Sequence, residues 1–209
     1  MKMAFTVASE ETLKGLRQQL LAWGVVQNKK YPWRYQADPY RVLVSEFMLH
    51  RTQTNQVLPV YQLFIHQWPS LVNYVQANKT EVDFILRSLG LQWRVRGMQC
   101  ALKTLWKDYG VVPIDYDKLI RIRGIGPYIA GATVCFTQNQ PIKLIDSNIV
   151  RVIGRVFGLD LRGEARRRRT VVNAIAVACD PLQPRDFYYA VIDLRSEEHT
   201  SELQSPNTI

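Results

Sequence analysis

The sequence predicts an all-α protein, and three observations lead to this prediction. Apolar residues recur at the three- and four-residue spacing of helices along most of the chain. No stretch shows the strict alternation of apolar and polar residues that marks a half-buried strand. The 209 residues, 47% of them hydrophobic, suffice for a hydrophobic core, and 22% charged with 11% aromatic residues argues against disorder.

The helical patterns follow one another along the chain with short turns between them. Leucines on one face predict a first helix at residues 11–23, where Gly24 offers a stop. Asp38-Pro39 opens a second helix, 39–51, which is apolar nearly all round, as a buried helix is. Further helical patterns cover roughly 53–67, 70–77, 79–89, 94–109, 115–122, 127–138, 147–158 and 165–179.

Composition limits the class of protein. No run of about 18 apolar residues is present, so we expect no membrane span and no membrane partner. Residues 1–10 lack the basic-then-apolar pattern of a secretory signal. The three cysteines, Cys100, Cys135 and Cys179, are widely spaced and odd in number, which disfavours a disulfide framework or a local zinc site. We therefore expect a basic cytoplasmic protein.

The last fifteen residues, RSEEHTSELQSPNTI at 195–209, break sharply from the apolar stretch before them. They resemble the translation of an adapter used in short-read DNA sequencing, and we expect a foreign, disordered tail. The alternative is an ordinary disordered tail. The segment holds one arginine and three glutamates, so the formal charge rises from +9 for the whole chain to +11 without it.

The segment DKLIRIRGIGPYIAGA, which begins at Asp117, predicts a helical hairpin that binds phosphate. Gly124 and Gly126 permit a tight turn and a close backbone approach, and Pro127 suits the start of the second helix. Free amides at that helix N-terminus favour an anion, and Ile125 would anchor the turn in the core. Basic residues lie nearby at Lys118, Arg121 and Arg123. The alternative is an ordinary helix connection with a glycine cap, but the charge favours a DNA backbone contact.

Glu46 lies inside the apolar helix expected at 39–51. A carboxylate there costs free energy unless it is paired or protonated. Because burial raises the pKa of an acid, Glu46 could carry a proton near neutral pH and deliver it. The alternative is a structural glutamate paired with Arg41, Arg51 or another base.

Asp146 precedes a helix whose apolar residues lie on one face. A carboxylate at a helix start accepts hydrogen bonds from the terminal amides and stays ionised. The alternative is a plain N-cap, which Asp146, Ser147 or Asn148 could each provide. Asp146 and Glu46 together would form the pair that glycosidic cleavage requires, a charged carboxylate and a neutral acid.

Four motifs in order resemble those of the helix-hairpin-helix DNA glycosylases. They are PWR at 32–34, DPYRVLVSEFMLHRTQT at 38–54, GIGPYIAGA at 124–132 and IDSNIVRV at 145–152. Within the family the chain looks most like the MutY-type adenine glycosylases and the related mismatch thymine glycosylases. The resemblance implies a two-lobed, endonuclease III-like fold with an active-site cleft between the lobes. One lobe would be a six-helix barrel at 31–138, with the hairpin at about 115–138, and the other would join the N-terminal helix of residues 1–30 to residues 139–194.

The resemblance also implies roles for single residues. A base would be flipped out of the duplex, Glu46 would protonate it (adenine at N7), and Asp146 would stabilise the oxocarbenium-like sugar and the incoming water or a transient covalent species. Tyr128 stands where bifunctional relatives hold a Schiff-base lysine, which implies a monofunctional enzyme that leaves an abasic site. The alternative for Tyr128 is an aromatic that packs the hairpin helix. Asn148 would steady Asp146 or water, or act as a simple cap.

The chain departs from the adenine pattern at the segments expected to fill the gap left by the flipped base. Adenine enzymes usually read LQQTQ where this chain has LHRTQ at 49–53, so Arg51 favours the thymine branch and Gln53 the adenine branch. Gln92 and Trp93 replace residues of the usual aromatic pair and are further candidates for gap filling. Ordinary surface or core roles are the alternative for each. Arg123 stands where the hairpin usually has proline.

Many relatives carry a [4Fe-4S] cluster held by four cysteines that begin shortly after the equivalent of Asp193-Leu194. None of the three cysteines of this chain falls in that pattern. We therefore expect no metal and no cofactor in this chain, a cluster in its full-length parent, and a C-terminally truncated second lobe.

Two function classes fit the hairpin and the charge. The first is a base-excision-repair glycosylase that acts as a monomer, associated with the nucleoid, on duplex DNA holding a mismatched or damaged base. Adenine opposite G or 8-oxoguanine ranks first as its target, and thymine opposite G close behind. The second is a non-catalytic helix-hairpin-helix DNA-binding module, which would have no use for a buried acid at Glu46. A bifunctional lyase is disfavoured by Tyr128.

Overall fold

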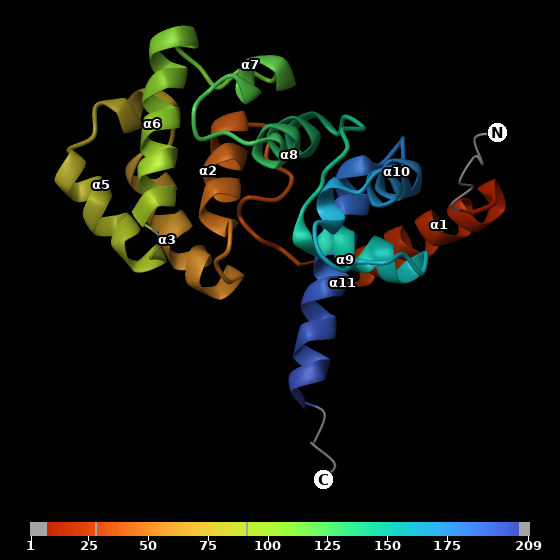
Figure 1. Ribbon diagram of the computed structural model, residues 1–209. Helices are drawn as coiled ribbons and strands as arrows, with labels where there is room; N and C mark the ends of the chain where they lie inside the picture. The colour runs from red at the N-terminus through yellow and green to blue at the C-terminus, as the bar shows by residue number, and fades with distance from the viewer. Residues whose placement is uncertain (1–7, 28, 91, 205–209) are drawn as a thin grey trace. The chain divides into compact units, whose positions relative to one another are not determined.

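A computed structural model describes residues 8–27, 29–90 and 92–204, with side chains as far as Glu197 (Figure 1). Throughout this part of the chain the regular elements are helices, and no strand is present, which confirms the all-α prediction. None of its helices is long and apolar enough to cross a membrane.

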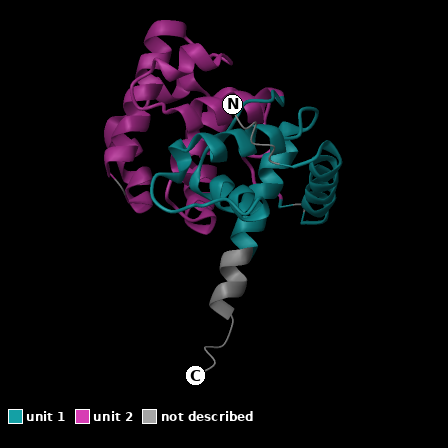
Figure 2. Ribbon diagram, turned by 45° about the vertical axis from the view of Figure 1, so that its right-hand side comes forward, with its two compact units in different colours: residues 1–29, 139–209 teal, residues 30–138 magenta. Residues whose placement is uncertain are grey.

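The chain forms two compact units, coloured separately in Figure 2. Unit 1 combines residues 1–29 with residues 139–209, and unit 2 is the continuous segment 30–138.

A buried helix, α2 (Pro39–Leu49), lies at the centre of unit 2. Its first turn is fixed by Asp38, whose carboxylate accepts the Tyr40 N–H at 2.9 Å, and by Pro39 at the first helical position. Residues 42–48 are all buried, as the apolar pattern predicted. Around α2 pack α3 (Thr54–Gln67), α6 (Gln92–Tyr109) and α8 (Pro127–Gln138). Since α8 is also buried over residues 129–136, the two helices form the core of this unit.

Four shorter elements complete unit 2 around this core (Figure 1). The 3-10 helix η1 continues α5 directly, and α7 precedes the turn into α8. Most were expected at these positions from the helical periodicity. They are α4 (Leu71–Val75), α5 (Lys79–Leu86), η1 (Arg87–Leu89) and α7 (Tyr116–Ile120).

Unit 1 packs the N-terminal helix against the C-terminal part of the chain. The helix α1 (Glu10–Gln27) contacts α10 (Arg169–Ala178) and α11 (Pro184–Gln204), and both α10 and α11 contact α9 (Ser147–Val156). The helix expected at 165–179 is divided, because Arg168 is extended between η2 (Ala165–Arg167) and α10. Arg168 instead donates hydrogen bonds to the backbone carbonyls of Asp160 and Arg162.

The expected stop at Gly24 is wrong, because α1 continues through it to Gln27. Because Gly24 has no side chain, α1 can approach α11 closely at this position. A Cβ atom on residue 24 would lie 2.9 Å from Cβ of Ala190 on α11. A larger side chain would push the two helices apart.

The C-terminal helix α11 was not predicted, and the expected disorder after residue 194 is wrong as far as Gln204. Residues 187–191 are buried all round, so they lack the one-sided periodicity that identifies a surface helix. The helix continues beyond them because residues 195–204 contain neither Gly nor Pro and include good helix formers. Glu197 also forms an ion pair with Lys29, with 2.7 Å between Lys29 Nζ and Glu197 Oε1. Residues 205–209 of the expected tail lie outside the described residues.

Candidate active site

The first candidate residue, Glu46, is only 6% exposed inside α2. It is the one buried acid in the described part of unit 2. Its neighbour Ser45 is also buried, and the Ser45 hydroxyl donates to the Val42 carbonyl at 2.8 Å. A carboxyl group kept from bulk water on a buried helix suits proton delivery to a bound ligand.

Asp146, in unit 1, is the N-cap of α9. Its Oδ1 accepts the Ile149 N–H at 2.8 Å, and its Oδ2 accepts the side-chain amide of Asn148 at 3.2 Å. Both carboxylate oxygens therefore receive hydrogen bonds at the start of a helix, which hold the carboxylate in one orientation. Asp146 is therefore the cap of α9, and Asn148 donates to it; the catalytic roles of both residues stay predictions. The group is half-buried, so it remains accessible to a ligand.

The hairpin of unit 2 is built as the sequence predicted. Asp115 caps α7 by accepting the Lys118 N–H at 3.0 Å, and α8 begins at Pro127. Between the helices the Ile125 N–H donates to the Ile122 carbonyl at 3.0 Å, and both isoleucine side chains are 4% exposed. The turn is therefore anchored in the core, as expected for Ile125.

The exposed side of the hairpin carries the residues expected to bind phosphate. Lys118, Arg121 and Arg123 are all exposed, and Gly126 is half-buried beside the first turn of α8. Tyr128 is half-buried on that first turn, one residue beyond Pro127. The backbone of a glycine turn, a helix start and three bases thus lie on one short segment, which suits a DNA backbone.

Gly124 gives this turn a strict sequence requirement. Its φ is +97°, and a Cβ atom there would lie 3.0 Å from the carbonyl oxygen of Gly97 on α6. We expect Gly124→Ala to lower the free energy of unfolding by about 1–3 kcal/mol, because backbone strain and a close backbone contact would both have to be relieved. Chemical denaturation measures the loss.

The matched control is Gly126→Ala, since a Cβ atom on Gly126 would meet no neighbouring atom within 4 Å and its φ is not positive. This variant should fold as stably as the unchanged protein. Equal stability of both variants would contradict the assigned role of Gly124.

Two turns of unit 2 carry the residues expected to fill the gap left by a flipped base. After α2, Arg51 has a φ of +62° and is exposed, and Gln53 precedes α3 as an exposed N-cap. After η1, Gln92 and Trp93 begin α6, with Trp93 58% exposed. The ring of Trp93 meets the ring of His50 edge-on at a centroid distance of 6.1 Å. The structure therefore brings the two turns together.

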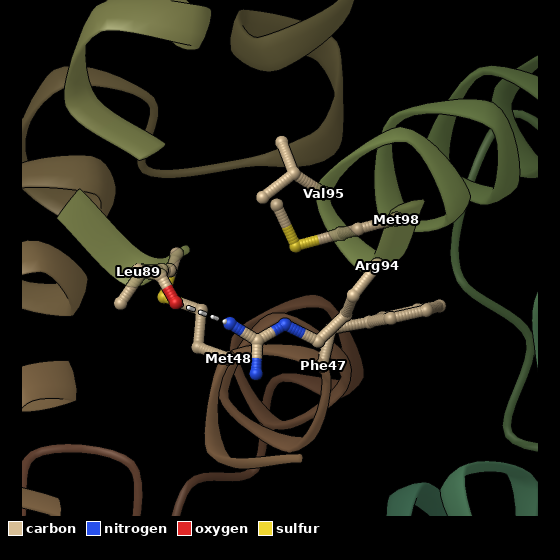
Figure 3. Close-up of a pocket in the computed structure, with 6 residues that line it drawn as sticks. All are labelled: Phe47, Met48, Leu89, Arg94, Val95 and Met98. Carbon is tan, nitrogen blue, oxygen red and sulfur yellow. Dashed lines mark hydrogen bonds between the residues drawn. The ribbon is translucent and has the colours of Figure 1, made fainter. Parts of the chain in front are cut away.

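The residue that joins these turns, Arg94, was missed by the sequence reasoning. Figure 3 shows its guanidinium beside Leu89 and Met48, and the group is 3% exposed. It donates to the carbonyls of Leu89 (3.1 Å) and His50 and to the Thr52 hydroxyl (2.6 Å). Burial lowers the pKa of this guanidinium, although an arginine retains its charge in proteins. The one available signal was a basic residue on the side of α6 that the apolar residues occupy.

The cysteines do not fit an iron–sulfur cluster. No disulfide joins these three cysteines, of which Cys100 and Cys135 lie in unit 2 and Cys179 in unit 1. Over the described ranges no group of three or more His, Cys, Asp or Glu side chains is placed to hold a metal ion.

Similar proteins were found by sequence. No family model matches the chain. It is 30% identical over 190 residues to the thymine-DNA glycosylase of Aeropyrum pernix, covering 87% of this chain and 84% of the relative. It is 31% identical over 184 residues to the thymine/uracil-DNA glycosylase of Pyrobaculum aerophilum, covering 83% and 78%. The adenine DNA glycosylase of Mycolicibacterium smegmatis is 33% identical over 139 residues, covering 66% and 47%.

Solved structures share the fold. A thermostable thymine-DNA glycosylase has a TM-score of 0.78 at 23% identity, covering 89% of this chain and 87% of that one. An endonuclease III trapped in a covalent intermediate with DNA has a TM-score of 0.72 at 16% identity, covering 88% and 85%. These likenesses confirm the predicted endonuclease III-like fold. With relatives at 30% identity over most of their length, the chain belongs to the helix-hairpin-helix family of base-excision DNA glycosylases, enzymes that hydrolyse the N-glycosidic bond of a base in DNA.

Proposed function

We propose that this chain excises thymine mispaired with guanine in duplex DNA and acts as a monomer. The choice of thymine rests on how much of each relative's length aligns with this chain. The thymine glycosylase of Aeropyrum pernix matches over 84% of its length, whereas the adenine glycosylase of Mycolicibacterium smegmatis matches over 47% of its length. Arg51 and the pair Gln92-Trp93, which depart from the adenine pattern, support the same choice.

In the proposed reaction Glu46 supplies the proton. As the bond between the sugar C1′ and the thymine nitrogen breaks, the bonding electrons leave with the base, and the Glu46 carboxyl protonates the departing thymine. Burial in α2 keeps this group from exchanging its proton freely with water.

Asp146 acts on the sugar. Its carboxylate stabilises the positive charge that develops at C1′ and accepts a proton from the water that attacks this carbon. The hydrogen bonds from Ile149 and Asn148 fix the direction of the carboxylate before the substrate arrives. The products are free thymine and an abasic site.

Adenine opposite guanine or 8-oxoguanine is the second candidate. Gln53 favours it, since that residue matches the adenine pattern and lies exposed at the start of α3. The adenine relatives also reach 33% identity over the part that aligns. The same two carboxyl groups would perform the chemistry, with adenine protonated at N7.

A single-turnover assay on T:G, U:G, A:G and A:8-oxoguanine duplexes distinguishes the two, with alkali converting abasic sites to strand breaks. We expect excision from T:G at a rate at least about tenfold above either adenine duplex, because a pocket that pairs its polar groups with one base leaves them unpaired with another. A T:A duplex is the control. Faster excision of adenine would overturn the choice of thymine.

Tyr128 predicts the type of product. A phenol cannot form a Schiff base with the sugar, so borohydride should trap no covalent protein–DNA adduct. The variant Tyr128→Lys places an amine on the first turn of α8, and we expect it to yield trapped adduct and strand breaks without alkali. Tyr128→Phe serves as the control and should trap nothing. Trapping with the unchanged protein would contradict a monofunctional enzyme.

A further inference from the structure

We infer that Arg94 is a positioning residue that locks the two gap-filling turns of unit 2 into one rigid wedge. The inference rests on the proposed function, in which these turns enter the duplex when the target base leaves it. The wedge is defined as residues 50–53, 89–90 and 92–93, all within the described part of the chain.

Arg94 forms hydrogen bonds with both turns of the wedge. Its guanidinium donates to the His50 and Leu89 carbonyls, which lie 44 and 5 residues away in sequence. His50 is the C-cap of α2, and Leu89 is the last residue of η1. Helix ends leave carbonyls without intrahelical partners, and a planar guanidinium can serve several of them at once. One side chain therefore closes two helix ends.

The backbone of each turn passes through the left-handed region. Arg51 follows His50 at a φ of +62°, and Gly90 follows Leu89 at a φ of +64°. The left-handed region is unfavourable for a residue with a Cβ atom, so the conformation of Arg51 requires support from its surroundings. Arg94 supplies this support on either side of Arg51, through the His50 carbonyl and the Thr52 hydroxyl.

The two turns present an exposed surface above the buried guanidinium of Arg94. Arg51, Gln53, Gln92 and Trp93 are all exposed, while the residue that connects their turns is 3% exposed. The edge-on contact of the His50 and Trp93 rings joins the same two turns at the surface. Exposed polar and aromatic groups on a buried charged support are suited to hold a fixed shape against DNA.

A fixed shape matters because base extrusion costs free energy. A base must be unstacked and unpaired before it leaves the duplex, and groups that fill the gap offset part of this cost. Groups that must also be ordered on binding offset less of it. We therefore assign to Arg94 a role in extrusion of a paired base, separate from the bond cleavage at Glu46 and Asp146.

The test compares two substrates of one sequence. In the first the target thymine is paired with guanine, and in the second it stands opposite a tetrahydrofuran abasic analogue, so that it is already unpaired. We expect Arg94→Met to slow single-turnover excision from T:G by roughly tenfold to a hundredfold, since it removes hydrogen bonds from a charged donor. On the unpaired substrate the same variant should be slowed far less. Arg94→Lys, which keeps the charge and part of the bonding, should lie between.

Two further variants keep the test decisive. Lys103→Met removes a charge from an exposed position of the same helix and should leave the ratio of the two rates unchanged. Thr52→Val removes one acceptor of Arg94 and should shift the ratio in the direction of Arg94→Met even if the latter folds poorly. Equal slowing of Arg94→Met on both substrates would assign Arg94 to general stability and overturn the inference.

Hydrogen exchange separates this inference from the proposed function. In the free protein, Arg94→Met should raise backbone exchange at residues 50–53, 89–90 and 92–93 while leaving α8 protected. This result requires no enzymatic activity. Unchanged exchange in the wedge would overturn the role of Arg94, whereas absence of excision by the unchanged protein would overturn the proposed function alone.

Discussion

Asp146→Asn is expected to reduce base excision by roughly a thousandfold or more while DNA binding persists. The amide cannot stabilise positive charge at C1′ or accept a proton from water. The fold should survive, because asparagine caps helices as well as aspartate does and can still accept the Ile149 N–H. Single-turnover excision and fluorescence anisotropy with labelled DNA measure the two properties on one preparation.

Asp38→Asn is the matched control for this change. Asp38 is also a helix N-cap, and its carboxylate accepts the Tyr40 N–H at 2.9 Å, but it has no role in the proposed chemistry. It should retain full excision. If Asp146→Asn remained as active as Asp38→Asn, Asp146 would be a cap and no more.

Glu46→Gln is expected to slow excision by about a hundredfold to ten-thousandfold, the range that a positioned acid contributes. Glutamine matches the size of the glutamate side chain in its buried position on α2 but has no acidic proton. Single-turnover excision from a T:G duplex measures the loss.

The exposed Glu81 on α5 provides the control for the same chemical change. Glu81→Gln should preserve the excision rate. A Glu46→Gln protein that folds normally and excises as fast as Glu81→Gln would show that another group donates the proton.

The sequence predicted the amphipathic helices and also α2 and α8, which are buried nearly all round, but it did not predict the C-terminal helix α11. The helix α11 illustrates the limit, because Phe187, Tyr188 and Val191 are all fully buried and give no amphipathic pattern. Gly24 illustrates a second limit. It was interpreted as a helix stop from its backbone freedom, but its position depends on contact with Ala190, 166 residues later in the sequence.

The site shows the same division between local and distant interactions. The cap at Asp146, the anchor at Ile125 and the burial of Glu46 follow from neighbouring residues and were predicted from the sequence. Arg94 was not, since its role depends on carbonyls contributed by separate helix ends. A residue that binds backbone atoms leaves no partner motif in the sequence, because every residue carries a carbonyl.

The proposed reaction is tested most sharply by the products that the unchanged protein forms from a T:G duplex under single-turnover conditions. Chromatography separates free base from DNA, and gel analysis counts strand breaks before and after alkali. We expect one free thymine for each abasic site, with strand breaks only after alkali. Tight, salt-dependent binding of the duplex without release of any base from T:G, A:G or A:8-oxoguanine would contradict the reaction and leave a DNA-binding protein without this chemistry.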